Sequence, residues 1–162
     1  MEQTKPASGN VQAELERRQK VAATTVAGLL IATVLLSVVS LLGKRFFRQQ
    51  DEPSLNVAVR IAIFTLGVGS VVWRRTKFSR MRLQDIGALQ GASGLISTLE
   101  KTTLQIAFLA AVIAAIGFIS TLLTGNDFYT YGAGVIAVVV LLYCYPTKAS
   151  WIRAVALFAQ NP

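Results

Sequence analysis

Residues 21–42, VAATTVAGLLIATVLLSVVSLL, decide the fold, because these twenty-two residues contain no charged side chain. An α-helix rises about 1.5 Å per residue, so the run would reach about 33 Å. The hydrocarbon core of a bilayer is roughly 30 Å thick. The run is also longer than the roughly 7–15 apolar residues of a secretory signal. It therefore predicts a helix that spans a membrane and remains in the mature chain.

Three further runs have the length or the boundaries of a membrane span. Residues 102–123, TTLQIAFLAAVIAAIGFISTLL, are again uncharged, and residues 128–145 form a shorter run with aromatic side chains at both ends. Tyrosine and phenylalanine rings at both ends are typical of a span whose ends lie at headgroup depth. Residues 55–73 are interrupted by Arg60, but a Trp-Arg-Arg boundary closes the run. We predict a span there as well.

The composition favours the same class of protein. Of 162 residues, 53% are hydrophobic and 15% are charged, whereas a soluble domain carries about 25% charged residues. A soluble bundle built from these runs would have almost no polar face to present to water. We predict an all-α polytopic membrane protein, with four transmembrane helices in an up-down-up-down bundle.

The predicted transmembrane domain covers residues 21–146, between an N-terminal tail (1–20) and a C-terminal tail (147–162). Apolar residues in 83–101 fall within one broad helical sector, which predicts an interfacial segment between the second and third spans. Residues 1–10 are expected to be disordered. The turn at residues 124–127 and Pro146 are expected to bound the fourth span.

Basic residues are unevenly divided between the two predicted sides of the membrane. Twelve of the sixteen lie on the side of the two termini, and four lie on the other side. Because loops rich in Lys and Arg stay in the cytoplasm, we expect both termini to be cytoplasmic. The expected location is a bacterial inner membrane, since no organellar transit segment is apparent in the sequence.

Several kinds of chemistry are excluded by residues that the chain lacks. It has no histidine and a single cysteine, Cys144. Imidazole ligands, a Ser-His-Asp triad and an internal disulfide are therefore impossible. Asp85, Glu100 and Asp127 are spread over both predicted sides and form no catalytic cluster. We expect no enzyme activity, no cofactor and no metal site.

A basic cluster follows the second predicted span. The segment 74–82, RRTKFSRMR, lies beside Trp73 and includes five cations, which are Arg74, Arg75, Lys77, Arg80 and Arg82. Cations beside a span anchor topology and attract anionic headgroups, each contributing about 1 kcal/mol. The alternative is docking onto an acidic partner subunit. No nucleic acid is expected, because no nucleic-acid-binding motif accompanies the cluster.

Two other features could contact lipid or protein. Arg60 is the only charge inside a predicted span, and its long side chain is expected to snorkel to the nearer interface. A lipid phosphate, a substrate anion or a carboxylate is the alternative partner. Ala107, Ala111 and Ala115 form a stripe at intervals of four residues. Small side chains let membrane helices approach closely, either within this chain or toward another subunit.

Residues 102–118, TTLQIAFLAAVIAAIGF, resemble the second helix of ATP synthase c subunits. The resemblance lies in a threonine pair, a middle rich in Ala and Leu, and a glycine at Gly117. In that family an ion-carrying carboxylate would fall near Ala111. This chain has a methyl group there and no Asp or Glu in any predicted span. The resemblance implies close helix packing without ion translocation.

These features together predict a non-catalytic accessory or assembly subunit of a larger membrane complex, of the respiratory, photosynthetic or transport kind. Its expected partners are anionic lipids and other integral membrane subunits. The alternative is a small transporter or channel that associates with itself. Pathways usually require charged or broken helices, and only Arg60 fits that description. An enzyme acting on a lipid has the least support.

Overall fold

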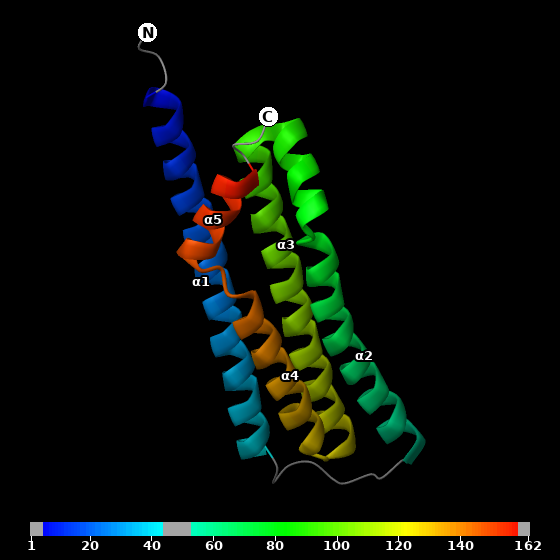
Figure 1. The fold of residues 1–162 in the computed structure, drawn as a ribbon. Helices are drawn as coiled ribbons and strands as arrows, with labels where there is room; N and C mark the ends of the chain where they lie inside the picture. The colour runs from blue at the N-terminus through cyan, green and yellow to red at the C-terminus, as the bar shows by residue number, and fades with distance from the viewer. Residues whose placement is uncertain (1–4, 44–52, 159–162) are drawn as a thin grey trace.

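The computed structural model describes residues 5–43 and 53–158, which form five helices (Figure 1). The helices are α1 (Lys5–Gly43), α2 (Pro53–Lys77), α3 (Arg80–Thr124), α4 (Phe128–Cys144) and α5 (Lys148–Phe158). These two ranges contain no strand. The all-α class predicted from the sequence is confirmed.

Three helical segments are long and apolar enough to cross a membrane: Asn10–Ser40, Val57–Lys77 and Ala88–Thr124. α4 passes the same test only together with α5, which is bent from it by 50°. Pro146 lies in the break, and a proline cannot donate the backbone hydrogen bond that would continue the helix. The chain thus has three such helices, or four if the bent pair is one span, which is consistent with an integral membrane protein.

α1 is longer than the predicted span. Its 39 residues extend over about 58 Å, so the uncharged run 21–42 continues as helix well beyond one side of a bilayer. The helix begins at Lys5. The prediction of disorder through residue 10 is therefore wrong for residues 5–10, and residues 1–4 lie outside the described part of the chain.

α3 reverses its direction at Gly91, the one residue in it with non-helical backbone angles (φ 66°, ψ −167°). This conformation is open essentially only to glycine. In Figure 1 the residues before Gly91 prolong α2 upward, and those after it run back down beside α2. The predicted interfacial segment 83–101 is thus divided, because residues 92–101 continue without a break into the predicted span 102–123.

The predicted turn between α3 and α4 is confirmed. Gly125 adopts a left-handed conformation (φ 68°), and its N–H donates to the Thr121 carbonyl oxygen at 2.8 Å. The buried Thr130 hydroxyl donates to the Thr121 hydroxyl at 2.8 Å. Ser40 of α1 donates to Thr130 at 3.2 Å. These hydroxyl groups hold α1, α3 and α4 together near the turn.

The buried apolar residues form two main regions. One lies between α1, α3 and α4 in the apolar zone and includes Val26, Ile106 and Leu141. Gly91 divides α3 into a short arm (80–90) and a long arm (92–124). The other region, called the end cluster below, joins the beginning of α1, both arms of α3, and α5. Its members are Leu15, Ala22, Leu83, Leu95, Ile96, Leu99 and Trp151. α2 contributes one buried apolar side chain, Ile63, to a third and smaller cluster with Ile113, Tyr129 and Ala133, so α2 lies at the periphery of the bundle.

Candidate lipid and partner surfaces

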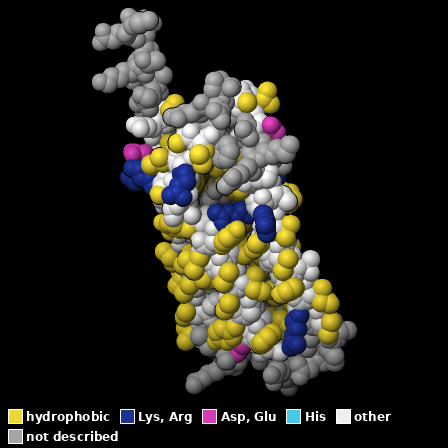
Figure 2. All heavy atoms as spheres, in the orientation of Figure 1, with side chains coloured by type: hydrophobic (Ala, Val, Ile, Leu, Met, Phe, Trp, Pro, Cys, Tyr) yellow, Lys and Arg dark blue, Asp and Glu magenta, His cyan; other side chains and the backbone are white. Residues whose placement is uncertain are grey.

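The predicted basic cluster lies where α2 ends and α3 begins. Arg74, Arg75 and Lys77 occupy the last turn of α2. Arg80 and Arg82 belong to the first turn of α3, and their side chains lie outside the described residues. Figure 2 shows Lys and Arg side chains in a band across the molecule, above a zone that is mainly hydrophobic.

Arg74 is fixed between two aromatic rings. Its guanidinium carbon lies 4.2 Å from the ring centroid of Tyr143 and 5.5 Å from that of Phe78. One guanidinium nitrogen also donates to the Tyr143 carbonyl oxygen. Cations over aromatic faces are attracted by the negative face of the ring. Arg74 therefore attaches the end of α2 to the end of α4.

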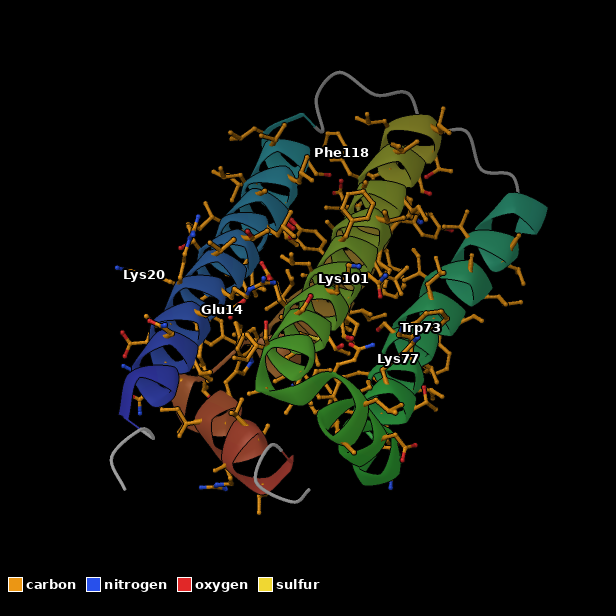
Figure 3. All side chains as sticks on the ribbon, turned by 90° about the horizontal axis from the view of Figure 1, so that it is seen from above. Glu14, Lys20, Trp73, Lys77, Lys101 and Phe118 are labelled. Atoms are coloured by element: carbon orange, nitrogen blue, oxygen red, sulfur yellow. The ribbon has the colours of Figure 1, made fainter. Side chains whose placement is uncertain are left out.

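Lys77 is placed over the ring of Trp73, with its nitrogen 5.4 Å from the ring centroid. Both residues lie on α2, on neighbouring turns (Figure 3). Within residues 5–43 and 53–158, no carboxylate pairs with Arg74, Arg75 or Lys77. We call these three cations, with Trp73, Phe78 and Tyr143, the basic–aromatic rim. Its positive charge is left for an external anion.

On the opposite side of the same end, the charges are paired across helices. Arg18 lies 3.0 Å from Glu14, as its spacing predicts, and 2.9 Å from Glu100 of α3. Lys148 of α5 lies 2.6 Å from Glu16. Helix spacing predicts a favourable pair of Glu16 with Lys20; the ion pair forms with Lys148, and the charge of Lys20 lowers the pKa of Glu16 to a smaller degree. Figure 3 shows Lys20 directed away from the helices.

These pairs shift two ionisable groups in the part of α1 that precedes the uncharged run. The hydrogen bond from Lys148, followed by its charge, lowers the pKa of Glu16. The hydrogen bond to Glu100 raises the pKa of Arg18. Both shifts favour the charged forms, because each group gains an opposite charge. The carboxylates in this region therefore hold α1, α3 and α5 together.

Arg60 lies on α2, toward the end of the bundle that is remote from α5. Its side chain is exposed, and the guanidinium carbon is 5.1 Å from the ring centroid of Phe128, the first residue of α4. Contact with the terminal residue of a neighbouring helix brings the charge to the end of the apolar zone. This is the position that snorkelling requires.

The alanine stripe of α3 faces this chain's own helices to different degrees. Ala107 is fully buried between α1 and α4, whereas Ala111 and Ala115 are half-buried. A second line of small residues, which the sequence analysis missed, is exposed on α1 at Thr24, Gly28 and Ala32. A Cβ atom added at Gly28 would meet nothing within 4 Å. The four-residue spacing of these small residues within the run 21–42 is the sequence feature that could have identified the line.

Cavities follow one another between α2 and α4. Two of about 330 Å³ are lined mainly by aliphatic and aromatic side chains, including Phe64 and Ile136, which belong to both. A third of about 610 Å³ lies at the rim and is lined by Arg74, Arg75 and Tyr143, among others. In the described part of the chain, no group of three acidic or cysteine residues could hold a metal ion.

Long apolar helices with a cationic band at one end are consistent with the class of integral membrane proteins. No family model, curated protein or solved structure matches this chain. The resemblance of residues 102–118 to the second helix of c subunits therefore stays a prediction. The position expected for the carboxylate, Ala111, lies half-buried in α3.

Proposed function

We propose that this protein is a non-catalytic accessory or assembly subunit of a larger complex in a membrane. In this proposal α1, α2, the long arm of α3, and α4 cross the membrane in alternating directions. The unequal charge of the two ends supports cytoplasmic termini. The beginning of α1, the short arm of α3, and α5 form a layer outside the lipid on that side.

The line of Thr24, Gly28 and Ala32 carries the proposal. These small residues are exposed on α1, between larger exposed side chains such as Ile31 and Leu35. Lipid provides no hydrophobic driving force for helix association, so close backbone approach at small residues is a main source of affinity between membrane helices. A helix of another subunit packed along this line would bury surface that this chain leaves uncovered.

Within the apolar zone, the side chains that line the grooves give little support to the alternative of a transporter or channel. Polar pathways are lined by charged side chains, carbonyl groups or water-filled constrictions. The groove between α2 and α4 is lined there mainly by valine, isoleucine and phenylalanine. Every buried side-chain nitrogen or oxygen in the described part of the chain has a hydrogen-bond partner.

The test is the mass of the particle extracted from its membrane in a native lipid disc. We expect a heteromeric particle that contains this chain. Gly28→Leu should release the chain from it, because the new side chain would separate the two helices. Gly69→Leu is the matched control, since Gly69 is exposed on α2 and an added Cβ would also meet nothing within 4 Å.

A particle built only from copies of this chain would contradict the subunit role and favour the transporter or channel. A single chain would contradict both. The topology has a separate test with protease-accessible tags at the two ends of the protein. Both tags should be cut from the same side of the membrane, and cutting from opposite sides would contradict four crossings.

A further inference from the structure

The cavities between α2 and α4 follow the same two helices from end to end. The two apolar ones share Phe64 and Ile136. The helices are close together at Gly67, where an added Cβ would lie 2.6 Å from Ile136 Cγ2. Arg74 and Arg75, at the rim, lie one helical turn beyond Val71. Along the same two helices, an apolar groove is thus followed by a cationic mouth, which Arg74 and Arg75 line.

We propose that this groove binds one anionic phospholipid from the leaflet at the α5 end. Its phosphate lies against Arg75 and Arg74, and one acyl chain follows Val71 and Val68 toward Phe64. The proposal does not depend on the role as a subunit. It requires only that α2 and α4 lie in lipid.

Charge at the mouth selects an anion. Arg75 is exposed, and no carboxylate of the described residues pairs with either arginine. Arg74 uses one N–H on the Tyr143 carbonyl, which leaves most of its five donors. Thr147 and Ser150 also line the mouth; their hydroxyl groups hydrogen-bond to each other at 2.7 Å and can still accept from donors of a lipid headgroup. Arginine suits a phosphate because its donors form a planar fork.

The depth of the groove fits one acyl chain. Phe64 is eleven residues from Arg75, which corresponds to about 16 Å along a helix. One leaflet contributes about 15 Å, half of a hydrocarbon core of roughly 30 Å. A helix of a partner protein is about 10 Å across with its side chains and does not fit a cavity of about 330 Å³ unless α2 moves away from α4.

The experiment measures the lipids that stay bound to the full-length protein after it is taken from vesicles of equal parts phosphatidylglycerol and phosphatidylcholine. Native mass spectrometry counts them as detergent removes the rest. The wild type should keep one phosphatidylglycerol about thirtyfold more often than one phosphatidylcholine, since Arg74 and Arg75 near an anionic headgroup contribute about 1 kcal/mol each. Equal retention of the two lipids would overturn the proposal.

Two variants separate the mouth from the groove. Arg75→Gln should lower the preference for phosphatidylglycerol to about fivefold, because Arg74 remains at the mouth, whereas Arg17→Gln, an equal charge change at an exposed site on α1, should leave it unchanged. Val71→Phe fills the groove and should lower retention of both lipids. Val38→Phe is its control, because Val38 is similarly exposed on α1 (43% against 38%). Thermal unfolding of each variant verifies that it is folded.

The proposal fails if Arg75→Gln keeps the full preference of the wild type or if folded Val71→Phe retains lipid like the wild type. It also fails if millimolar glycerol 3-phosphate displaces the bound lipid, since the mouth would then recognise a free phosphate without the acyl chain. Arg75 is exposed, so its substitution should leave the packing of the bundle intact. The lipid preference of Arg75→Gln therefore still tests the proposal if Val71→Phe unfolds.

Discussion

The two sides of the α5 end of this protein use their charges differently. On the side of α1 and α5, the cations Arg18 and Lys148 pair with carboxylates on other helices or on their own. On the side of α2 and α4, Arg74 and Lys77 of the basic–aromatic rim lie against aromatic rings, Arg75 is exposed, and none of the three has a carboxylate partner among the described residues. The cations on the α1 and α5 side are neutralised by carboxylates of this chain, whereas those of the rim keep their positive charge.

This difference separates a part of the molecule that is held by its own contacts from a part that depends on its surroundings. The paired charges surround the end cluster, which contains buried Leu95, Leu99 and Trp151. Ion pairs there connect α1, α3 and α5 around an apolar core. The rim lies on α2, whose apolar window is 17% buried, as is that of α1, compared with 44% for that of α3. α2 therefore leaves most of its apolar surface for contacts outside this chain, and the cations of the rim have no carboxylate partner among the described residues that would reduce that dependence.

The largest effect is expected for Trp151→Ala. Trp151 is 4% exposed in the end cluster, and removing a buried Trp side chain typically costs about 3–5 kcal/mol. We expect thermal unfolding in detergent at a much lower temperature and rapid proteolysis of α5. Trp73→Ala is the control: Trp73 is 52% exposed, and a surface change of this kind alters stability by about 0.5 kcal/mol or less. Equal losses for the two variants would contradict the division.

The next largest effect on stability is expected for Gly91, where the two arms of α3 meet. Its backbone angles cost an alanine about 1–3 kcal/mol, so Gly91→Ala should destabilise the hairpin between the two arms of α3. Gly69→Ala serves as the control, because Gly69 lies within α2 and an added Cβ meets nothing within 4 Å. Denaturation in detergent compares the two. An equal stability of both variants would show that the reversal does not need the left-handed conformation.

Much of the fold could be predicted because it depends on short-range properties of the sequence. Long apolar runs identify helices for lipid wherever they occur, and the turn at Gly125 and the end of α4 before Pro146 follow from local chemistry. The reversal at Gly91 could not be predicted. Gly87, Gly91 and Gly94 are close together, and which of them takes a positive φ depends on how the arms of α3 pack.

The candidate surfaces show the same limit. The basic residues 74–82 were found as a cluster, since they are adjacent in the sequence. The stacking of Arg74 on Tyr143 was not foreseen, because the two residues are 69 positions apart. Glu14 and Arg18 form their local ion pair. Glu16 forms its ion pair with Lys148 of α5 and not with Lys20, which is nearer in the sequence. A partner from another helix can replace a local one, and helix spacing alone does not reveal it.

A smaller effect is expected from the pair between Arg18 and Glu100. Their side chains are 35% and 20% exposed, so we expect a small but measurable coupling, as is usual for ion pairs in contact with solvent. A double-mutant cycle with Arg18→Gln and Glu100→Gln, read by thermal unfolding, measures it. High salt should reduce the coupling.

The control cycle combines Arg75→Gln with Glu100→Gln. Because the rim has no carboxylate partner among the described residues, these two changes should be additive. A coupling between Arg75 and Glu100 as large as that between Arg18 and Glu100 would show that both sides share one charge network, and the contrast between them would be lost.

The smallest effect is expected from Glu16 and Lys148, whose side chains are 60% and 57% exposed. The pKa of Glu16 is lowered from its ordinary value of 4.5. A depressed carboxyl pKa stabilises the folded state above the unfolded pKa, and this contribution disappears as the pH falls through the folded pKa. Protection of α5 from protease should therefore weaken slightly below pH 4.5. Glu16→Gln should remove that part of the pH dependence, and the exposed control Arg17→Gln should keep it. If Glu16→Gln and the wild type lose protection alike, Lys148 does not attach α5 to α1 through this carboxylate.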